Sequence, residues 1–449
     1  MLAHPPHNHQ PPHPFVPSNN EPDPFQSIYH SFANLTLTPS SPSPNPKTPP
    51  IITTETSTGT PNPPAPSTSA SITTTTNNNS GSSNDNKNEP EPIPVNPIFP
   101  PGDNVIFAHS SFFRRDNPTW ALPSPAEVRL QAAALGISLP AAGQSPSSLP
   151  CPGAAVEAKL VPFPSLGLLV KYGPETVVAP AEAKGLLLLK RALENHTGER
   201  LPVPEVFGWR RDGEGGPVGG AVGERFVYMG LPAAEGGVVT LEERWGLMSE
   251  AEKVGVAAQL REVVVGGWRR LRQGGTVGFV GSVDNGPLAD QVFRKCAVAT
   301  GTRLGPFPSV AAFHDYFVSM AVALSESGQP GAGAGQVRYT PHHIFPDDVP
   351  IMFTHGSLHP RNIIVSIGQN PRLVSVLGWE QAGWYPAYWE LCKARWECSR
   401  RGSLGDWESN YLPWILDVDG LRTTLCGWNV GPLCQYWDYF VGLMHRWES

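Results

Sequence analysis

The sequence has few cysteines and no pattern that would pair them. Its 449 residues contain six, without a CxxC pair or a regular framework. They are Cys151, Cys296, Cys392, Cys398, Cys426 and Cys434. Small secreted domains that depend on disulfides show such frameworks, so the cysteines favour an intracellular protein with reduced thiols.

Long apolar runs are also missing, and a leader is not expected. The apolar stretches, such as residues 185–189, are far shorter than the ~20 residues that span a bilayer. The first ten residues, MLAHPPHNHQ, contain neither a basic leader nor an apolar stretch, so no signal peptide is expected. We therefore expect a cytoplasmic protein with no membrane partner.

The chain also has no excess of basic residues. Lys and Arg number 32 against 39 Asp and Glu, which gives a net charge of −7. This balance does not indicate a nucleic-acid partner, since such proteins carry a basic patch or stripe. The short cluster Arg269, Arg270 and Arg272 is interpreted as a solvated helix end.

Composition changes sharply along the chain. Residues 1–100 are dominated by Pro, Ser, Thr and Asn, which bury too little apolar surface to offset the entropy of ordering the backbone. This segment is predicted to be disordered. Residues 101–150 are expected to form an extension with a short helix, residues 151–230 a β-rich part, and residues 231–449 a mainly helical part.

Local patterns predict the elements. Ser124 can cap a helix at residues 125–135, because Pro125 suits its first turn and Glu127 stands at the reciprocal capping-box position. Thr240 and Ser249 are candidate caps further along the chain. Strands are predicted at 155–163, 166–173, 201–209 and 224–229, with a helix at 180–196 and a hairpin turn at 212–220. Later predictions are a helix at 313–324, strand-like runs between 351 and 379, and a helical tail whose tryptophans pack in the core. The expected class is α+β.

The most informative stretch is FTHGSLHPRNIIV at residues 353–365, followed by LVSVLGWE at residues 373–380. It resembles the aminoglycoside phosphotransferase family in the broad sense that includes choline-kinase-like enzymes. Members of that family carry His-Gly-Asp-Leu-His-Pro-x-Asn-Ile and then Asp-Trp-Glu after an apolar strand. Here Ser357 stands where the catalytic Asp belongs, and Gly378 stands where the metal-binding Asp belongs. The positions that match are His355, His359, Asn362, Trp379 and Glu380, and the match continues into residues 382–390.

The resemblance implies a two-lobed, protein-kinase-like fold, with residues 151–230 as the small β-rich lobe and residues 231–449 as the helical lobe. It implies that Lys171 holds nucleotide phosphates and that Glu182 orients it by an ion pair. It also implies that Met229 lies where a strand leads into the adenine-binding hinge. The implied cofactors are ATP and Mg²⁺, and the implied substrate is a hydroxyl of a small molecule.

The two replacements bear directly on activity. Ser357 cannot accept a proton as a carboxylate does, and such general-base help accelerates reactions by about 10²–10⁴-fold. Gly378 offers no ligand, which leaves Asn362 as the obvious protein ligand for Mg²⁺, an ion that usually uses one or two carboxylates. The histidines His355 and His359 are expected to brace the loop.

Three hypotheses remain open on the sequence alone. The favoured one is a catalytically impaired phosphotransferase or pseudoenzyme. The second is an active small-molecule kinase that uses a displaced acid, Glu380 or less favourably Asp347 or Asp348. The third is the non-functional product of a drifting gene copy. The sequence does not identify a substrate or a protein partner, and it assigns no chemical role to residues 278–293.

Overall fold

A computed structural model describes the chain in twelve stretches. They are residues 91–114, 121–137, 158–175, 177–198, 200–213, 223–232, 237–275, 278–293, 303–326, 344–401, 404–425 and 428–445. Most of the predicted disordered segment, the hairpin turn after residue 213, and Cys151, Cys296 and Cys426 lie outside these stretches.

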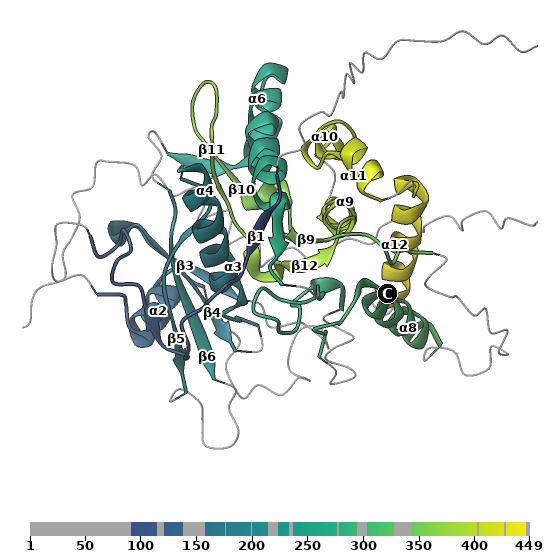
Figure 1. Ribbon diagram of the computed structural model, residues 1–449. Coiled ribbons are helices and arrows are strands. Elements are labelled where there is room, and N and C mark those ends of the chain that lie inside the picture. The colour runs from purple at the N-terminus through teal and green to yellow at the C-terminus, as the bar shows by residue number, and fades with distance from the viewer. Residues whose placement is uncertain are drawn as a thin grey trace, which may run out of the picture. The chain divides into compact units, whose positions relative to one another are not determined.

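The β-rich part is a five-stranded antiparallel sheet with strand order β2-β5-β6-β4-β3 (Figure 1). Its strands are β2 (Val105–Ile106), β3 (Lys159–Phe163), β4 (Leu168–Pro174), β5 (Glu205–Asp212) and β6 (Glu224–Gly230). The four longer strands agree with the sequence prediction. Side chains alternate between two covered faces, because successive residues of a strand point to opposite sides.

The two faces of this sheet have different partners. Val170 and Tyr172 pack with residues of helix α2 (Pro125–Ala134) in one apolar cluster. The opposite face packs in the main core with helix α3 (Ala181–Leu189), which continues as a π-helical turn (Lys190–Glu194) and α4 (Asn195–Thr197). Lys171 lies between Val170 and Tyr172 in β4, so the alternation directs it to the α3 face.

The first strand lies inside the segment predicted to be disordered. β1 (Ile93–Val95) pairs in parallel with β8 (Leu271–Gln273), and Ile93 and Val95 are both buried in the main core. Two apolar residues at alternate positions are enough to join a strand to this core despite the surrounding prolines. Ordered structure therefore begins before residue 100.

The helical part contains two small sheets, β11-β10-β7 and β12-β9, that carry the motif stretch. The strands are β7 (Val238–Thr240), β9 (Ile351–Thr354), β10 (Ile363–Ser366), β11 (Leu373–Val376) and β12 (Gly383–Pro386). The helices are α5 (Leu241–Trp245), α6 (Glu250–Arg261), α8 (Val310–Glu326), α9 (Trp389–Arg401), α10 (Leu412–Ile415), α11 (Val418–Thr424) and α12 (Val430–His445). A β-rich part followed by a larger helical part confirms the predicted α+β class.

A second apolar core joins α8, α9 and α12. Trp389 and Trp437 are fully buried in it, with ring centroids 5.4 Å apart in an edge-to-face arrangement. The tail tryptophans Trp384 and Trp407 are buried in the main core, whereas Trp414 is 43% exposed and stacks against Arg261. In the described stretches we find no helix with the length and apolar character needed to cross a membrane.

The arginine cluster at residues 269–272 does not form a solvated helix end. Arg269 donates to the backbone carbonyls of Phe353 and Ala387, and burial lowers its pKa to about 10. The segment turns into strand β8 at Leu271 rather than ending a helix in water. Arg269 therefore links the end of a helical segment to β9 and the start of α9.

The helix caps give a test of the local sequence rules. Ser249 accepts a hydrogen bond from the Glu252 amide, and the Glu252 carboxylate accepts one from the Ser249 amide. Ser249→Ala removes this cap and is expected to lower the free energy of unfolding by about 1 kcal/mol in denaturant titrations. Ser399→Ala serves as the control, because the exposed Ser399 hydroxyl bonds only within its own helix. Equal effects of the two substitutions would contradict the capping account.

Candidate active site

Lys171 is the centre of a buried ion cluster. Its Nζ lies 2.8 Å from Glu182 Oε2 and 3.1 Å from Glu380 Oε2. Lys171 comes from the central sheet, Glu182 from α3, and Glu380 from a short 3₁₀ turn (Trp379–Gln381) after β11. The predicted pair of Lys171 and Glu182 is therefore present, and Glu380 is a second carboxylate on the same ammonium.

Charge and burial compete inside this cluster. Burial raises the pKa of Glu182, although Lys171 opposes the rise. Burial also acts on Glu380, yet the charge of Lys171 holds the pKa of Glu380 below its usual range. The two carboxylates overcome the effect of burial on Lys171 and raise its pKa, so the lysine stays charged. Glu380, 32% exposed, is the more accessible of the two acids and carries the ionised form.

The motif loop runs from the end of β9 to β10. Asn362 Nδ2 donates to the Ser357 backbone carbonyl at 2.8 Å and to Ser357 Oγ at 3.1 Å. The two predicted site residues, Ser357 and Asn362, are therefore in contact, and the side-chain contact joins a hydroxyl to an amide. Ser357 is only 5% exposed and contributes no carboxylate.

Gly378 contacts the same asparagine. It has φ +80°, a left-handed conformation that costs a residue with a Cβ about 1–2 kcal/mol. A Cβ built there would lie 2.6 Å from Asn362 Nδ2, so any side chain requires Asn362 to move. Asp and Asn tolerate this backbone conformation better than other residues with side chains. Ser357, Asn362 and Gly378 thus form one coupled group, and it contains both positions at which the resemblance implies an acid.

The loop backbone is held from behind by a residue that the sequence analysis did not single out. Glu390, in the first turn of α9, accepts the amide N–H groups of His355 at 2.6 Å and Gly356 at 3.1 Å. Gly356 itself has φ +76°, and a Cβ there would lie 3.0 Å from the Gln381 carbonyl oxygen. Glu390 lies in the stretch that resembles the family. It is 34 residues from Gly356 in the sequence, and so local sequence patterns do not indicate the contact.

The histidines brace the loop, as expected. His355 Nε2–H donates to the Leu377 carbonyl at 2.9 Å, and its Nδ1 accepts the Ser357 amide at 3.1 Å. This arrangement fixes the neutral tautomer, and burial keeps the pKa of His355 below its usual value. Trp379 packs edge-to-face against His355 at 4.3 Å and is fully buried. The loop and the turn after β11 are therefore held together mainly by packing and backbone hydrogen bonds.

Residues 278–293, which had no predicted role, tie two parts of the site together. Asp284 pairs with Lys184 of α3 at 2.5 Å. Asp290 pairs with Lys393 of α9 at 2.9 Å, and both side chains are completely buried. Lys393 also donates to Gln381, the residue after Glu380. The segment thus fixes the helix of Glu182 relative to the turn of Glu380.

The remaining predicted residues differ in their relation to the cluster. Met229 and Lys171 share a sheet face, because Val227 is the register partner of Lys171 and Met229 follows two residues later. Met229 is buried in the main core. Asp347 bonds His314 Nδ1 at 2.7 Å, and Asp348 is exposed.

The donors for Mg²⁺ do not fit that ion in this arrangement. Gly378 provides none, Asn362 turns its amide nitrogen toward Ser357, and Glu380 is bonded to Lys171. Among the residues that the structure describes, no group of three or more His, Cys, Asp or Glu side chains could hold a metal ion.

One comparison with known proteins covers this site. The model of the phosphotransferase enzyme family matches residues 339–412, which contain the loop, both replaced positions and the start of α9. This segment is therefore similar to the phosphotransferase enzyme family. No curated protein matches the chain.

Solved structures similar to this chain include three small-molecule kinases. An aminoglycoside phosphotransferase from Streptomyces rimosus is 15% identical, with 62% of this chain and 89% of that chain covered and a TM-score of 0.30. A Plasmodium vivax ethanolamine kinase is 12% identical, with coverage of 62% and 70% and a TM-score of 0.30. A choline kinase from Streptococcus pneumoniae is 16% identical, with coverage of 66% and 89% and a TM-score of 0.30. Identities and scores this low establish neither an activity nor a substrate for this chain.

His359 makes the stability of the loop depend on pH. It is fully buried, its Nδ1 accepts the Arg361 amide, and burial with the nearby Arg361 charge lowers its pKa to about 3. The unfolded chain, with a histidine pKa of about 6.5, binds this proton more readily. Stability should therefore fall as pH drops below about 6.5, by up to about 1.4 kcal/mol per pH unit from this group.

His359→Asn keeps an acceptor for the Arg361 amide and removes the titration. We expect its free energy of unfolding to vary less steeply between pH 7 and pH 5 than that of the wild type, in denaturant titrations at each pH. His109→Asn, at an exposed position, is the control and should keep the wild-type slope. Parallel curves for wild type and His359→Asn would show that the buried histidine does not govern the pH dependence.

Proposed function

We propose that the chain is a catalytically impaired member of the phosphotransferase family, a pseudoenzyme whose ancestral reaction was ATP-dependent phosphorylation of a small-molecule hydroxyl. The observation that carries the proposal is the contact of Asn362 Nδ2 with Ser357 beside Gly378. A hydroxyl and a hydrogen atom occupy the two positions from which carboxylates would act. The roles of a catalytic acid at position 357 and a metal-binding acid at position 378 are assigned by the resemblance of the motif to the family.

Each replacement removes a different contribution to phosphoryl transfer. A base that accepts the substrate proton contributes about 10²–10⁴-fold, and Ser357 does not supply it at neutral pH. A carboxylate that holds Mg²⁺ neutralises phosphate charge, and Gly378 offers no oxygen. The effects of losing the base and the metal-binding carboxylate on the rate are not additive, but neither loss restores what the other removes.

The nucleotide part of the site is better preserved than the metal part. Lys171, held by Glu182 at 2.8 Å, would hold the nucleotide phosphates, and the sheet face of Met229 would adjoin the adenine. ATP, when bound, would supply the phosphoryl group. Glu380 lies on the same lysine, so phosphate oxygens and the Glu380 carboxylate would compete for one cation. We place the protein in the cytoplasm, where the sequence predicts the chain to be.

One observation favours the alternative of an active small-molecule kinase. Glu380 is ionised, partly exposed and within 3.1 Å of the lysine, so a carboxylate is present two residues from the missing one. If Glu380 left Lys171 when nucleotide bound, it could serve as the displaced acid. This role would make turnover depend on its charge.

ATP turnover by the wild type and by Glu380→Gln separates the two functions. The pseudoenzyme account predicts that both proteins form ADP from ATP no faster than Lys171→Met, with Mg²⁺ present and a panel of small-molecule alcohols and aminoglycosides added. Turnover by the wild type that disappears in Glu380→Gln would instead establish the active kinase. Glu408→Gln, at a half-buried acid on the far part of the helical region, is the matched control.

A further inference from the structure

Two thiols lie in contact away from the phosphotransferase site. Cys392 of α9 and Cys434 of α12 have their sulfur atoms 3.7 Å apart, and the residues are 0% and 5% exposed. Their helices pack against each other in the second core. Cys398, the third described cysteine, is also buried but lies beside Trp407.

The two thiols differ in their readiness to ionise. The hydrogen bond from Cys392 and the charge of Arg395 hold the pKa of Cys434 below its ordinary value. Burial and its neighbour raise the pKa of Cys392. Because the thiolate is the nucleophile, Cys434 is the residue that reacts with an oxidant first, and Cys392 is placed to react with the oxidised Cys434 next.

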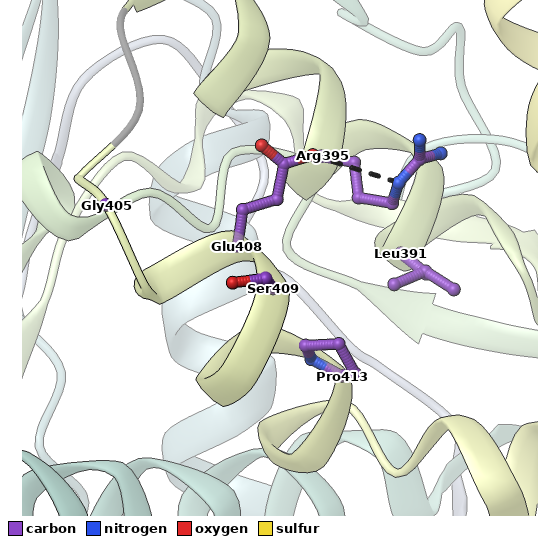
Figure 2. Close-up of a pocket in the computed structure, with 6 residues that line it drawn as sticks. All are labelled: Leu391, Arg395, Gly405, Glu408, Ser409 and Pro413. Atoms are coloured by element: carbon purple, nitrogen blue, oxygen red, sulfur yellow. Dashed lines mark ion pairs between the residues drawn. The ribbon is translucent and has the colours of Figure 1, made fainter.

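Solvent reaches the residue beside Cys434. Arg395 interacts with Cys434 and also lines a cavity of about 360 Å³ between α9 and the turn that leads into α10. Figure 2 shows Arg395 and Leu391 from α9 facing Glu408, Ser409 and Pro413 across this cavity. A small oxidant entering there is separated from the thiolate by the Arg395 side chain.

We propose that Cys392 and Cys434 form a redox modification site, at which hydrogen peroxide converts the two thiols into an internal disulfide joining α9 to α12. The Cys434 thiolate attacks one peroxide oxygen, and the hydroxide that leaves is protonated to water. The resulting sulfenic acid is then attacked by Cys392 sulfur, which loses its proton, and the hydroxyl group leaves as a second water. Two thiols are oxidised, and one peroxide is reduced to two waters.

The disulfide requires small movements and has a definite consequence. The sulfur atoms must approach from 3.7 Å to about 2.05 Å, by rotation of the two side chains between packed helices. The bond would close a loop of 42 residues and so restrict the unfolded chain. It would also attach α12 to α9 next to Glu390 and Lys393, the residues that hold the loop and the 278–293 segment. Internal disulfides in reducing compartments are mostly transient and redox-sensing, so this one would report oxidation.

The full chain is treated with hydrogen peroxide, its remaining thiols are alkylated under denaturing conditions, and its peptides are identified by mass spectrometry. We expect a cross-linked pair of peptides that contains Cys392 and Cys434, absent before treatment and lost again in dithiothreitol. The midpoint of thermal unfolding should rise on oxidation of the wild type and of Cys398→Ser, and should not rise for Cys434→Ser.

Recovery of both cysteines as alkylated thiols, at peroxide doses that oxidise free dithiothreitol, would overturn the proposal. Separate oxidation of either sulfur to sulfinic acid without the cross-link would overturn it as well. The wild-type measurement decides the matter even if a serine variant fails to fold. None of these outcomes depends on nucleotide binding.

Discussion

A lysine ammonium buried in a protein needs anions around it, because an unpaired buried charge costs far more than the fold can offset. Lys171 obtains two, and both follow it in the chain, Glu182 in the next helix and Glu380 209 residues later. Glu182 connects it to α3, and Glu380 connects it to the turn after β11. The ion cluster therefore joins the central sheet, the helix that packs on it and the motif segment. Removing either carboxylate would disturb the position of all three.

The loop keeps its shape without the two acids for a physical reason. Glu390 binds the backbone amides of His355 and Gly356, and His355 binds the carbonyl of Leu377. These bonds do not involve the side chains at positions 357 and 378. A change from Asp to Ser or Gly at those positions removes chemical groups while the supports of the backbone remain. Under the proposed function, the backbone of the loop is therefore retained although its two acids are absent.

The sequence predicted what depends on near neighbours. The capping boxes at Ser124, Thr240 and Ser249 fixed three helix starts, because both partners lie within four residues. The pair of Lys171 and Glu182 followed from the motif. The contact of Lys171 with Glu380 did not, since it joins residues 209 positions apart and depends on how the sheet meets the turn.

Other contacts were not predicted from the sequence, because they also join residues far apart in the chain. β1 joins a strand about 180 residues away, and only its two buried apolar residues signal it. The sequence predicts a solvated charge at Arg269, because it gives no sign of the backbone carbonyls of Phe353 and Ala387 that accept its hydrogen bonds. Glu390 and Asp290 are single acids whose partners come from other segments, and no spacing in the sequence indicates them.

Calorimetric titration of ATP into the protein, with and without Mg²⁺, tests the central claim most directly. The account predicts weak binding by the wild type that Mg²⁺ does not strengthen, since Asn362 and Gly378 offer no carboxylate to the ion. The double variant Ser357→Asp with Gly378→Asp should gain Mg²⁺ dependence, provided that Asn362 turns aside for the new Cβ. Tight, Mg²⁺-dependent binding by the wild type would contradict the account, because another acid would then complete the metal site.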